Sequence, residues 1–388
     1  MKRLVKADYS RQYYKEYAKG HERDGSAAGP GKAVVSTSRF RPCGAVLRCR
    51  GSRAPLFRRA GRYRPAATSW FTFPFYCFMD LHFVRRGTGR PLLLVHGIGG
   101  SWRSWNTIID ALAAERDVIA VDLPGHGETP QLAGENSIAT LADAVTGFLT
   151  QHDLLGIDAV GSSMGARLVL ELARRGGVLG AVVSLDPGGF WQGWQIPFFY
   201  HSVDVSVKLV KALQPVMPAL AGSAVGRTVL LPQFSARPWA VDSQQAIDEM
   251  HSFAHSPAFD ELLDQLAHGQ VQQPAPKGSI PGPLVIGWGR QDRVCLPSQS
   301  KLALEKFPDA RLYWFEHCGH FPQWDQPAEA ARLILAVTSR QPFTDASIAQ
   351  AKPVKAAPAW PKAAVVGAAL ALVAGGIWLL SSRRKGRQ

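Results

Sequence analysis

The 388-residue sequence contains no P-loop, no internal repeat and only five cysteines. Without a P-loop we do not expect a nucleoside triphosphatase of that class, and without a repeat we expect no solenoid. The sequence also lacks a cofactor motif and a cluster of metal-ligating residues, so we expect neither a cofactor nor a bound metal. Cys295 and Cys318 follow two predicted strands and could form a disulfide. Free thiols are the alternative that we favour.

Acidic residues are scarce at both ends of the chain. Residues 1–78 hold 17 Lys/Arg against 4 Asp/Glu, and residues 352–388 hold 7 basic residues and no acidic ones. Residues 79–351 carry 20 basic and 26 acidic residues, so the net charge of +14 comes from the two ends. A basic stretch rich in Gly, Arg, Ser and Pro is typical of disorder when it has no periodic apolar residues. We therefore expect no nucleic-acid partner.

The sequence from Met79, MDLHFVRRGTGRPLLLVHG, looks like the N-terminus of a folded domain. We interpret residues 1–78 as a disordered or non-native basic extension and Met79 as the natural start. A targeting segment is the alternative, because the stretch is rich in Arg and poor in acidic residues. The lack of an A-x-A cleavage site argues against a secretory signal.

From Leu92 onward, short apolar runs alternate with amphipathic helical patterns, which predicts parallel β/α units, and Asp80–Val84 before them is a possible edge strand. One predicted helix begins after Ser137 as N-cap, and another places Trp102, Trp105 and Leu112 on one face. The predicted strands are Asp80–Val84, Leu92–Val95, Val118–Val121, Asp158–Val160, Ala181–Leu185, Leu284–Gly287 and Leu312–Phe315. We expect residues 79–186 and 283–340 to form one α/β core.

Residues 187–282 interrupt this alternation with helical patterns alone, around 204–215, 239–254 and 257–268. Ser256 is the expected N-cap of the last helix, with Pro257 at its first position. The chain then returns to a strand through a stretch rich in Pro and Gly. We expect this insertion to be a helical lid over the carboxyl ends of the strands, where open α/β sheets bind ligands.

Four motifs follow predicted strands in order: HGIGGSWRSW from His96, DLPGHGETP from Asp122, GSSMG from Gly161 and GHFPQWDQP from Gly319. Together they resemble the α/β-hydrolase superfamily, over roughly residues 79–340. Within it, the chain looks most like the lidded group of esterases, perhydrolases and meta-cleavage-product hydrolases. The resemblance implies a mostly parallel central sheet with a helical lid inserted between strands.

The pentapeptide GSSMG is a G-x-S-x-G between a strand and a helix, which selects Ser163 rather than Ser162 as nucleophile. A serine hydroxyl needs a base, and we predict His320 for this role, with Asp292 as the acid that orients it. Asp186, which follows the preceding strand, is the alternative acid. We expect the other histidines near these motifs, His96, His126 and His317, to have structural roles or to point away.

By resemblance, the backbone amides of Ile98 and Met164 form the oxyanion hole. The start of the insertion is rich in aromatic residues, which predicts an apolar acyl substrate. Trp191, Trp194 and Trp324 are the candidate pocket residues. The predicted reaction is hydrolysis of a carboxylic ester or a similar acyl bond.

Two other functions remain open at this point. Trp324 resembles the aromatic position of the C–C bond hydrolases of the meta-cleavage type. Those enzymes usually have Asn where this chain has Ser162, and no match to their lid arginine is clear. A ligand-binding receptor on a hydrolase fold is the second alternative.

The C-terminal end follows a different pattern: a Pro/Ala linker over 341–362, eighteen uncharged residues over 363–380 and a basic tail over 381–388. At about 1.5 Å per residue the uncharged segment spans about 27 Å, close to a bilayer core of about 30 Å. Trp360 and Trp378 bracket it. We predict a single-pass C-terminal membrane helix, with the side of the catalytic domain left open. Small residues at Gly367, Ala371 and Gly375 suggest pairing into a homodimer.

Overall fold

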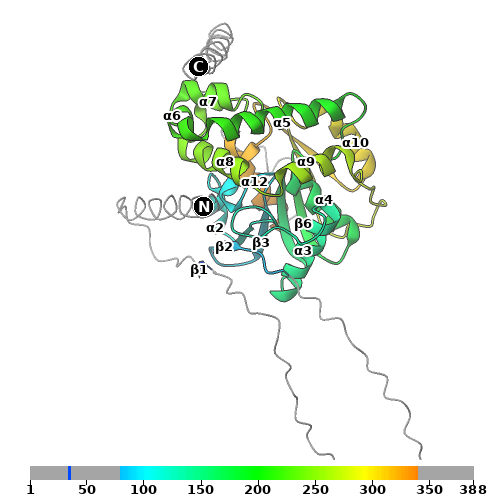
Figure 1. Cartoon of the computed structure of the whole chain (residues 1–388). Helices are drawn as coiled ribbons and strands as arrows, with labels where there is room; N and C mark the ends of the chain where they lie inside the picture. Colours follow the sequence, from blue (N-terminus) through cyan, green and yellow to red (C-terminus); the bar gives the residue numbers. More distant parts are fainter. Residues whose placement is uncertain (1–33, 36–78, 340–388) are drawn as a thin grey trace, which may run out of the picture. The chain divides into compact units, whose positions relative to one another are not determined.

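The computed structural model describes residues 34–35 and 79–339, and all statements below refer to these ranges. Eight strands form one sheet in the order β1-β2-β4-β3-β5-β6-β7-β8 (Figure 1). β2 pairs antiparallel with β1 and β4, while every pair from β4 to β8 is parallel. The strands are β1 Val34–Val35, β2 Phe83–Arg86, β3 Pro91–Val95, β4 Asp117–Val121, β5 Ile157–Ser162, β6 Leu179–Leu185, β7 Leu284–Gly289 and β8 Arg311–Phe315. The predicted mostly parallel sheet is thus confirmed.

The sheet order reverses its direction at β3. From β3 the chain moves outward to β4 and then returns to the other side of β3 to form β5. The connections that follow β3 and β5 therefore leave in opposite directions and open a crevice at their carboxyl ends. His96 follows β3 and Ser163 follows β5, so two of the predicted motifs meet at this point.

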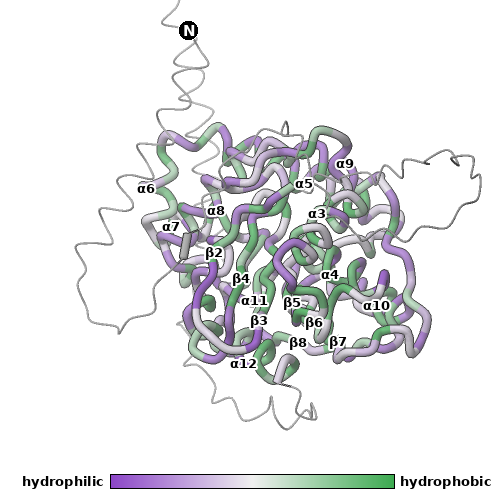
Figure 2. Tube along the Cα trace, turned by 90° about the horizontal axis from the view of Figure 1, so that it is seen from below, coloured by the Kyte–Doolittle hydropathy of each residue, from purple (hydrophilic) through white to green (hydrophobic). Residues whose placement is uncertain are grey.

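Alternate residues of the strands face two separate cores. Leu93 and Val95 of β3 pack into the core that includes α3 (Ile138–Gln151) and α4 (Met164–Arg175). Leu92 and Leu94 pack into the core on the other face, which includes α2 (Ile109–Ala113) and α12 (Pro327–Val337). Strands that are buried on both faces have continuous apolar sequences. In Figure 2, β3, β4 and β6 are accordingly coloured mostly green, for hydrophobic.

Helix α3 begins where the sequence predicts. The Ser137 hydroxyl accepts a hydrogen bond from the Thr140 amide at 3.3 Å, and the Thr140 hydroxyl accepts one from the Ser137 amide at 2.9 Å. This reciprocal cap satisfies two amides that would otherwise lack a partner. The expected apolar face, which includes Leu141, Val145 and Phe148, is buried.

The helix predicted around Trp102 to Leu112 is instead divided into the 3-10 helix η1 (Trp102–Trp105) and α2. The Ser101 hydroxyl caps η1, and the amide of Ile108 bonds to the carbonyl of Trp105, three residues back. These tighter bonds break the α-helical path before α2 begins. The predicted apolar residues are still buried, because both short helices face the sheet.

Residues 187–282, here called the inserted segment, connect β6 to β7 and contain no strand. Its helices lie together over one edge of the sheet (Figure 1). They are α5 Gln195–Leu213, α6 Met217–Gly222, α7 Ala224–Leu230, α8 Ser243–His255 and α9 Phe259–His268, with the 3-10 turns η2 Gln214–Val216 and η3 Pro238–Ala240. Helices stand at the three predicted places, whereas α6 and α7 were not predicted.

The predicted N-cap of α9, Ser256, was wrong. Its N-cap is Ala258, two residues after the predicted Ser256. The Ser256 hydroxyl donates to the carbonyl of Gly125 at 3.0 Å instead. A tertiary contact to the loop after β4 thus uses the group that was expected to cap the helix.

The remaining helices, α10 (Ser300–Lys306), η4 (Pro297–Gln299) and α11 (Pro322–Asp325), lie in the connections around β7 and β8. Within the described ranges, no helix is both long and apolar enough to cross a bilayer. The predicted membrane helix over 363–380 and nearly all of the N-terminal extension lie outside these ranges.

Candidate active site

Ser163 lies at a sharp turn between β5 and α4. Its backbone has φ 56° and ψ −115°, a conformation that non-glycine residues rarely adopt. A Cβ at Gly161 would stand 2.1 Å from the carbonyl oxygen of Gly165, and one at Gly165 would stand 2.2 Å from that of Val95. Only glycine fits at both flanking positions, so the pentapeptide pattern follows directly from the packing of this turn.

The Ser163 hydroxyl contacts His320, and His320 contacts Asp292. The distance from Ser163 Oγ to His320 Nε2 is 2.9 Å, and that from His320 Nδ1 to an Asp292 carboxylate oxygen is also 2.9 Å. The contact with Asp292 sets the tautomer: Nδ1–H donates to the carboxylate, which leaves Nε2 to accept from the serine hydroxyl. All three side chains are buried. The structure therefore brings together the three residues that the sequence pointed to.

The second oxygen of Asp292 accepts two backbone hydrogen bonds, from the amides of Val294 at 2.8 Å and Cys295 at 3.0 Å. These bonds fix the carboxylate in the loop after β7. The loop of His320 is held by Asp325, which accepts from the amides of Gly319 at 2.7 Å and Ala236 at 2.8 Å. Asp292 and the loop of His320 are thus both fixed by hydrogen bonds to backbone amides.

Asp186, the alternative acid, lies close to this pair without contacting His320. One of its oxygens accepts from the amide of Gly289 at 2.8 Å, and its backbone φ is 49°. Burial raises the pKa of Asp186 well above its usual range, and the nearby charge of Asp292 raises it further. Two adjacent buried carboxyls cannot both ionise readily, and the raised pKa favours the neutral form of Asp186.

Ser162 points to a different partner. Its hydroxyl accepts a hydrogen bond from the side-chain amide of Gln323 at 3.1 Å, and the residue is 1% exposed. Gln323 belongs to α11, just after the histidine loop. Ser162 therefore helps to join β5 to the histidine loop, and no base contacts it.

Ile98 and Met164 line the same small cavity as Ser163 and His320. Met164 is the first residue of α4, so its amide has no partner inside the helix. The loop after β3 turns tightly, since the amide of Gly100 bonds to the carbonyl of Gly97 at 3.1 Å and Gly99 has φ 73°. A Cβ at Gly97 would lie 3.1 Å from the Cβ of Ser163, so this loop passes directly beside the serine.

The cavity beside Ser163, here called the serine cavity, has a volume of about 20 Å³. Its walls are almost entirely apolar, and most of them come from the inserted segment. The wall residues from this segment are Gly188, Trp191, Phe199, Val203, Val207, Phe234, Phe253, Phe259 and Leu266.

The three predicted pocket tryptophans have different environments. Trp191 lines the serine cavity, stacks on Phe199 at 3.8 Å and donates to the carbonyl of Val294 at 3.0 Å. Trp194 does not line it: this residue is 66% exposed and contacts the exposed ring of Phe198. Trp324 is buried beside Phe321 but is not part of the cavity wall. Of the three, only Trp191 has the predicted position.

The chain matches one known protein family over most of the described residues. Residues 92–333 match the alpha/beta hydrolase family. The chain belongs to this family. A relative of this hydrolase is the dihydrolipoyllysine-residue acetyltransferase component of the acetoin cleaving system of Pseudomonas putida, with 30% identity over 64% of the chain and 63% of the relative. The hydrolase thus spans less than two thirds of the length of that protein.

Two other similar proteins are covered over about nine tenths of their own length. A 2-hydroxy-6-oxo-6-phenylhexa-2,4-dienoate hydrolase of Burkholderia cepacia is 26% identical over 66% of the chain and 90% of the relative. The solved structure of a thermophilic esterase from Thermogutta terrifontis is 20% identical and covers 66% of the chain and 91% of that structure, with a TM-score of 0.51. This structural likeness shows the fold.

Two histidines of the family motifs have structural contacts in this hydrolase. His96 Nδ1 donates to the carbonyl of Gly97 at 2.7 Å, and its Nε2 accepts from the amide of Leu123 at 3.0 Å. Burial lowers the pKa of His96 and lowers that of His126 to about 3. The His126 ring is therefore neutral at physiological pH, and the His96 ring is neutral because its Nε2 accepts from a backbone amide. His317 is exposed.

Cys295 and Cys318 are buried free thiols in this hydrolase, so the alternative of a disulfide is wrong. Asp292, Cys295 and His320 bring three potential ligand atoms within 4.8 Å of one another. Burial raises the pKa of the Cys295 thiol well above its usual range, which disfavours the thiolate that a metal would need. The carboxylate and the imidazole already bind each other, so the donor set does not fit a metal.

The cavity walls contributed by α8 and α9 were not predicted from the sequence. Phe253 and Phe259 appear in the sequence as ordinary apolar positions of amphipathic helices. A weak signal was Gly99 in the loop after β3, where a Cβ would meet the rings of Phe253 and Phe259 at 2.7 and 2.8 Å. The contact itself depends on how the inserted segment folds back.

Proposed function

We propose that this protein is a serine hydrolase that cleaves a carboxylic ester or a similar acyl bond through an acyl-enzyme. The observation that carries the proposal is the buried chain from Ser163 Oγ to His320 Nε2 and from His320 Nδ1 to Asp292, each contact 2.9 Å long. Such a chain activates a hydroxyl that is a weak nucleophile by itself.

In the proposed reaction, Ser163 Oγ attacks the carbonyl carbon of the ester while its proton passes to His320 Nε2. The carbonyl oxygen takes the negative charge and accepts hydrogen bonds from the amides of Ile98 and Met164. Collapse of this intermediate breaks the bond to the alcohol, which leaves with the proton held by His320. Water then attacks the acyl-enzyme by the same steps and releases the acid.

We further propose that the inserted segment acts as a lid. The serine cavity, at about 20 Å³, has room for about one water molecule and not for an ester. Substrate entry therefore requires α5, α8 and α9 to move away from the serine. Because the walls that they supply are apolar, the proposed substrate carries an apolar acyl group.

The test uses p-nitrophenyl esters from acetate to decanoate with the full-length chain, and Ser163→Ala as the control. We expect turnover that depends on Ser163 and an optimum chain length that reports the size of the opened pocket. If a folded wild-type protein binds the esters but turns over none of them, the receptor alternative replaces this proposal.

Hydrolysis of a C–C bond is a second candidate, because a relative with 26% identity is named as a 2-hydroxy-6-oxo-6-phenylhexa-2,4-dienoate hydrolase. Against it, no arginine lines the serine cavity among the described residues, and Ser162 binds Gln323. The named dienoate itself is the discriminating substrate. Faster cleavage of this compound than of every ester would favour the second candidate.

We also propose that residues 363–380 anchor the enzyme to a membrane as a single C-terminal helix. The proposal rests on eighteen uncharged residues bracketed by Trp360 and Trp378 and followed by four basic residues. A small-residue face on this helix would support a homodimer. The catalytic domain would then work at a membrane surface, where apolar esters concentrate.

A further inference from the structure

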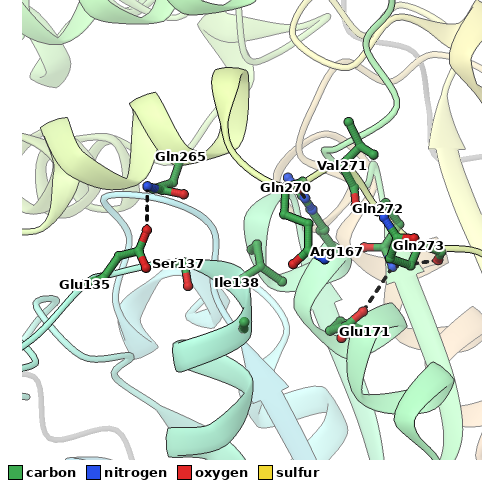
Figure 3. A pocket seen from close by; sticks show the side chains of 11 residues that line it. Glu135, Ser137, Ile138, Arg167, Glu171, Gln265, Gln270, Val271, Gln272 and Gln273 are labelled. Atoms are coloured by element: carbon green, nitrogen blue, oxygen red, sulfur yellow. Dashed lines mark hydrogen bonds between the residues drawn. The ribbon is translucent and has the colours of Figure 1, made fainter.

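A second and larger cavity lies on the other side of α9 from the serine cavity. Its volume is about 240 Å³, below the size of most drug-binding pockets, so it suits a small molecule. It opens between the start of α3, the middle of α4, the helix α9 and the segment that follows α9 (Figure 3). The lining residues are Glu135, Ser137, Ile138, Ala139, Arg167, Glu171, Gln265, Gln270, Val271, Gln272 and Gln273.

Arg167 is the charged group of this cavity that has no hydrogen bond to a carboxylate among the described residues, although the charge of Glu171, one turn along α4, raises its pKa. It is only 3% exposed, and one nitrogen of its Nη pair donates to the carbonyl of Gln270. Its Nε–H is buried without a hydrogen-bond partner. Burial lowers the pKa of the guanidinium to about 10, so it still carries its charge at neutral pH. A buried charge without a partner is costly unless a ligand supplies one.

The nearby carboxylates are already engaged. Glu171 accepts hydrogen bonds from Arg174 at 2.7 and 2.9 Å and from Arg175 at 3.0 Å, which compensates its charge. Glu135 is exposed and accepts from the side-chain amide of Gln265 at 2.8 Å, as the dashed line in Figure 3 shows. Arg167 is therefore the buried charge of this cavity that no carboxylate contacts, whereas Glu135 is exposed to solvent.

We propose that this cavity, here called the Arg167 cavity, binds a small monocarboxylate through the guanidinium of Arg167. The planar guanidinium matches a carboxylate, and the glutamine side chains offer further donors along the wall. One buried positive charge suits a singly charged anion. The exposed carboxylate of Glu135 would repel a doubly charged phosphate more strongly than a singly charged carboxylate.

The position of the Arg167 cavity connects it to the serine. The amide of Arg167 bonds to the carbonyl of Ser163 at 3.1 Å, one turn away on α4. Gln265 of the Arg167 cavity and Leu266 of the serine cavity are neighbours on α9. A carboxylate bound between α4 and α9 therefore holds α9 against the core and disfavours opening. This consequence for turnover rests on the proposed lid, whereas binding itself does not.

The test is a calorimetric titration of the full-length chain with sodium butyrate. We expect saturable binding at one site, and binding of the neutral butyramide at least about tenfold weaker because it lacks the charge-assisted bond. Arg167→Gln should weaken butyrate binding by about tenfold or more. Arg85→Gln, which removes a surface arginine on β2, should leave it unchanged and is the matched control.

A second variant keeps the proposal testable if Arg167→Gln fails to fold. Ala139→Phe fills the Arg167 cavity from α3 without changing its charge, and should abolish butyrate binding while retaining a cooperative thermal transition. Butyrate binding that persists unchanged in either folded variant would place the anion elsewhere, the serine cavity included, and overturn the proposal. So would the lack of binding to the wild type, or tighter binding of inorganic phosphate than of butyrate.

Discussion

Ser163 has its unusual backbone conformation because two hydrogen bonds and the glycines near it determine the turn. Its amide donates to the carbonyl of Leu185 at 2.9 Å, its carbonyl accepts from Arg167, and glycines on either side remove the clashes. Strained backbone of this kind persists only where the surroundings enforce it, and it is common at active sites. The strain directs the Ser163 hydroxyl towards His320, whereas the hydroxyl of Ser162 is directed towards Gln323.

We therefore expect Ser163→Ala to lower the esterase rate by about three orders of magnitude or more. Ser162→Ala loses only a neutral hydrogen bond and should keep the rate within about tenfold. The measurement is turnover of a p-nitrophenyl ester together with labelling by a fluorophosphonate. Labelling that persists in Ser163→Ala, or is lost only in Ser162→Ala, would contradict the assignment of the nucleophile.

The two candidate acids should respond differently to removal of their charge. Asp292→Asn takes the anion from His320 and favours the wrong tautomer, so we expect kcat to fall by about three to four orders of magnitude. Burial and the charge of Asp292 raise the pKa of Asp186 and favour its neutral form, which Asn resembles, so Asp186→Asn should retain most activity. Kinetics of both variants at pH 7 provide the test, and a larger loss in Asp186→Asn would reverse the two roles.

At the scale of the elements, strands and motifs were predictable because their signals are local. Buried parallel strands are continuous apolar runs, and G-x-S-x-G reflects the packing of Gly161 and Gly165 in a single turn. The start of α9 was not predictable, since Ser256 bonds to Gly125, a residue far away in sequence. The break between η1 and α2 likewise came from capping of a tight turn rather than from the apolar pattern.

The inserted segment contacts the core through a buried carboxyl group. Glu249 of α8 accepts hydrogen bonds from the hydroxyl of Ser104 in η1, with 3.0 Å to each oxygen. Burial raises the pKa of Glu249 to about 8. In the unfolded chain the same carboxyl has its ordinary pKa of about 4.3. The folded state therefore binds a proton that the unfolded state has already released across the interval between these two pKa values.

This difference predicts how stability depends on pH. The favourable contribution of protonated Glu249 is complete below the unfolded pKa and is lost as the pH rises through the folded pKa of about 8. Between about pH 5 and pH 8 we expect its part of the free energy of unfolding to fall by on the order of 1 kcal/mol per pH unit. Glu249→Gln keeps the contact with Ser104 and should remove this part of the slope.

Urea unfolding at several pH values measures the slope in the wild type and in the variant. Glu305→Gln, which changes an exposed carboxylate on α10, is the control and should retain the wild-type slope. Equal slopes in the wild type and Glu249→Gln would show that Glu249 is not the titrating group.

At the scale of the whole molecule, the candidate site combines loops that follow four different strands, β3, β5, β7 and β8, with walls from the inserted segment. The residues that follow the strands could be identified from the sequence, since the carboxyl ends of parallel strands meet at one edge. The walls could not, because the apolar faces of α8 and α9 give no information about which core residues they cover. The substrate preference therefore depends on the part of the molecule that the sequence predicted least well.

The proposed anchor makes the last prediction at this scale. Half of residues 363–380 are Ala or Gly, so the free energy of inserting this segment into a bilayer should be small. One central charge costs roughly 2.5 to 3.5 kcal/mol on the scale of translocon insertion, which is enough to reverse such a balance. We expect the full-length chain to sediment with membranes and to resist carbonate extraction, and Leu372→Arg to release it. Leu372→Ala is the matched control and should remain bound.

Deletion of the residues after Arg340 should yield a soluble enzyme with unchanged activity on soluble esters. A wild-type chain that is already soluble without detergent would contradict the anchor and require another partner for 363–380.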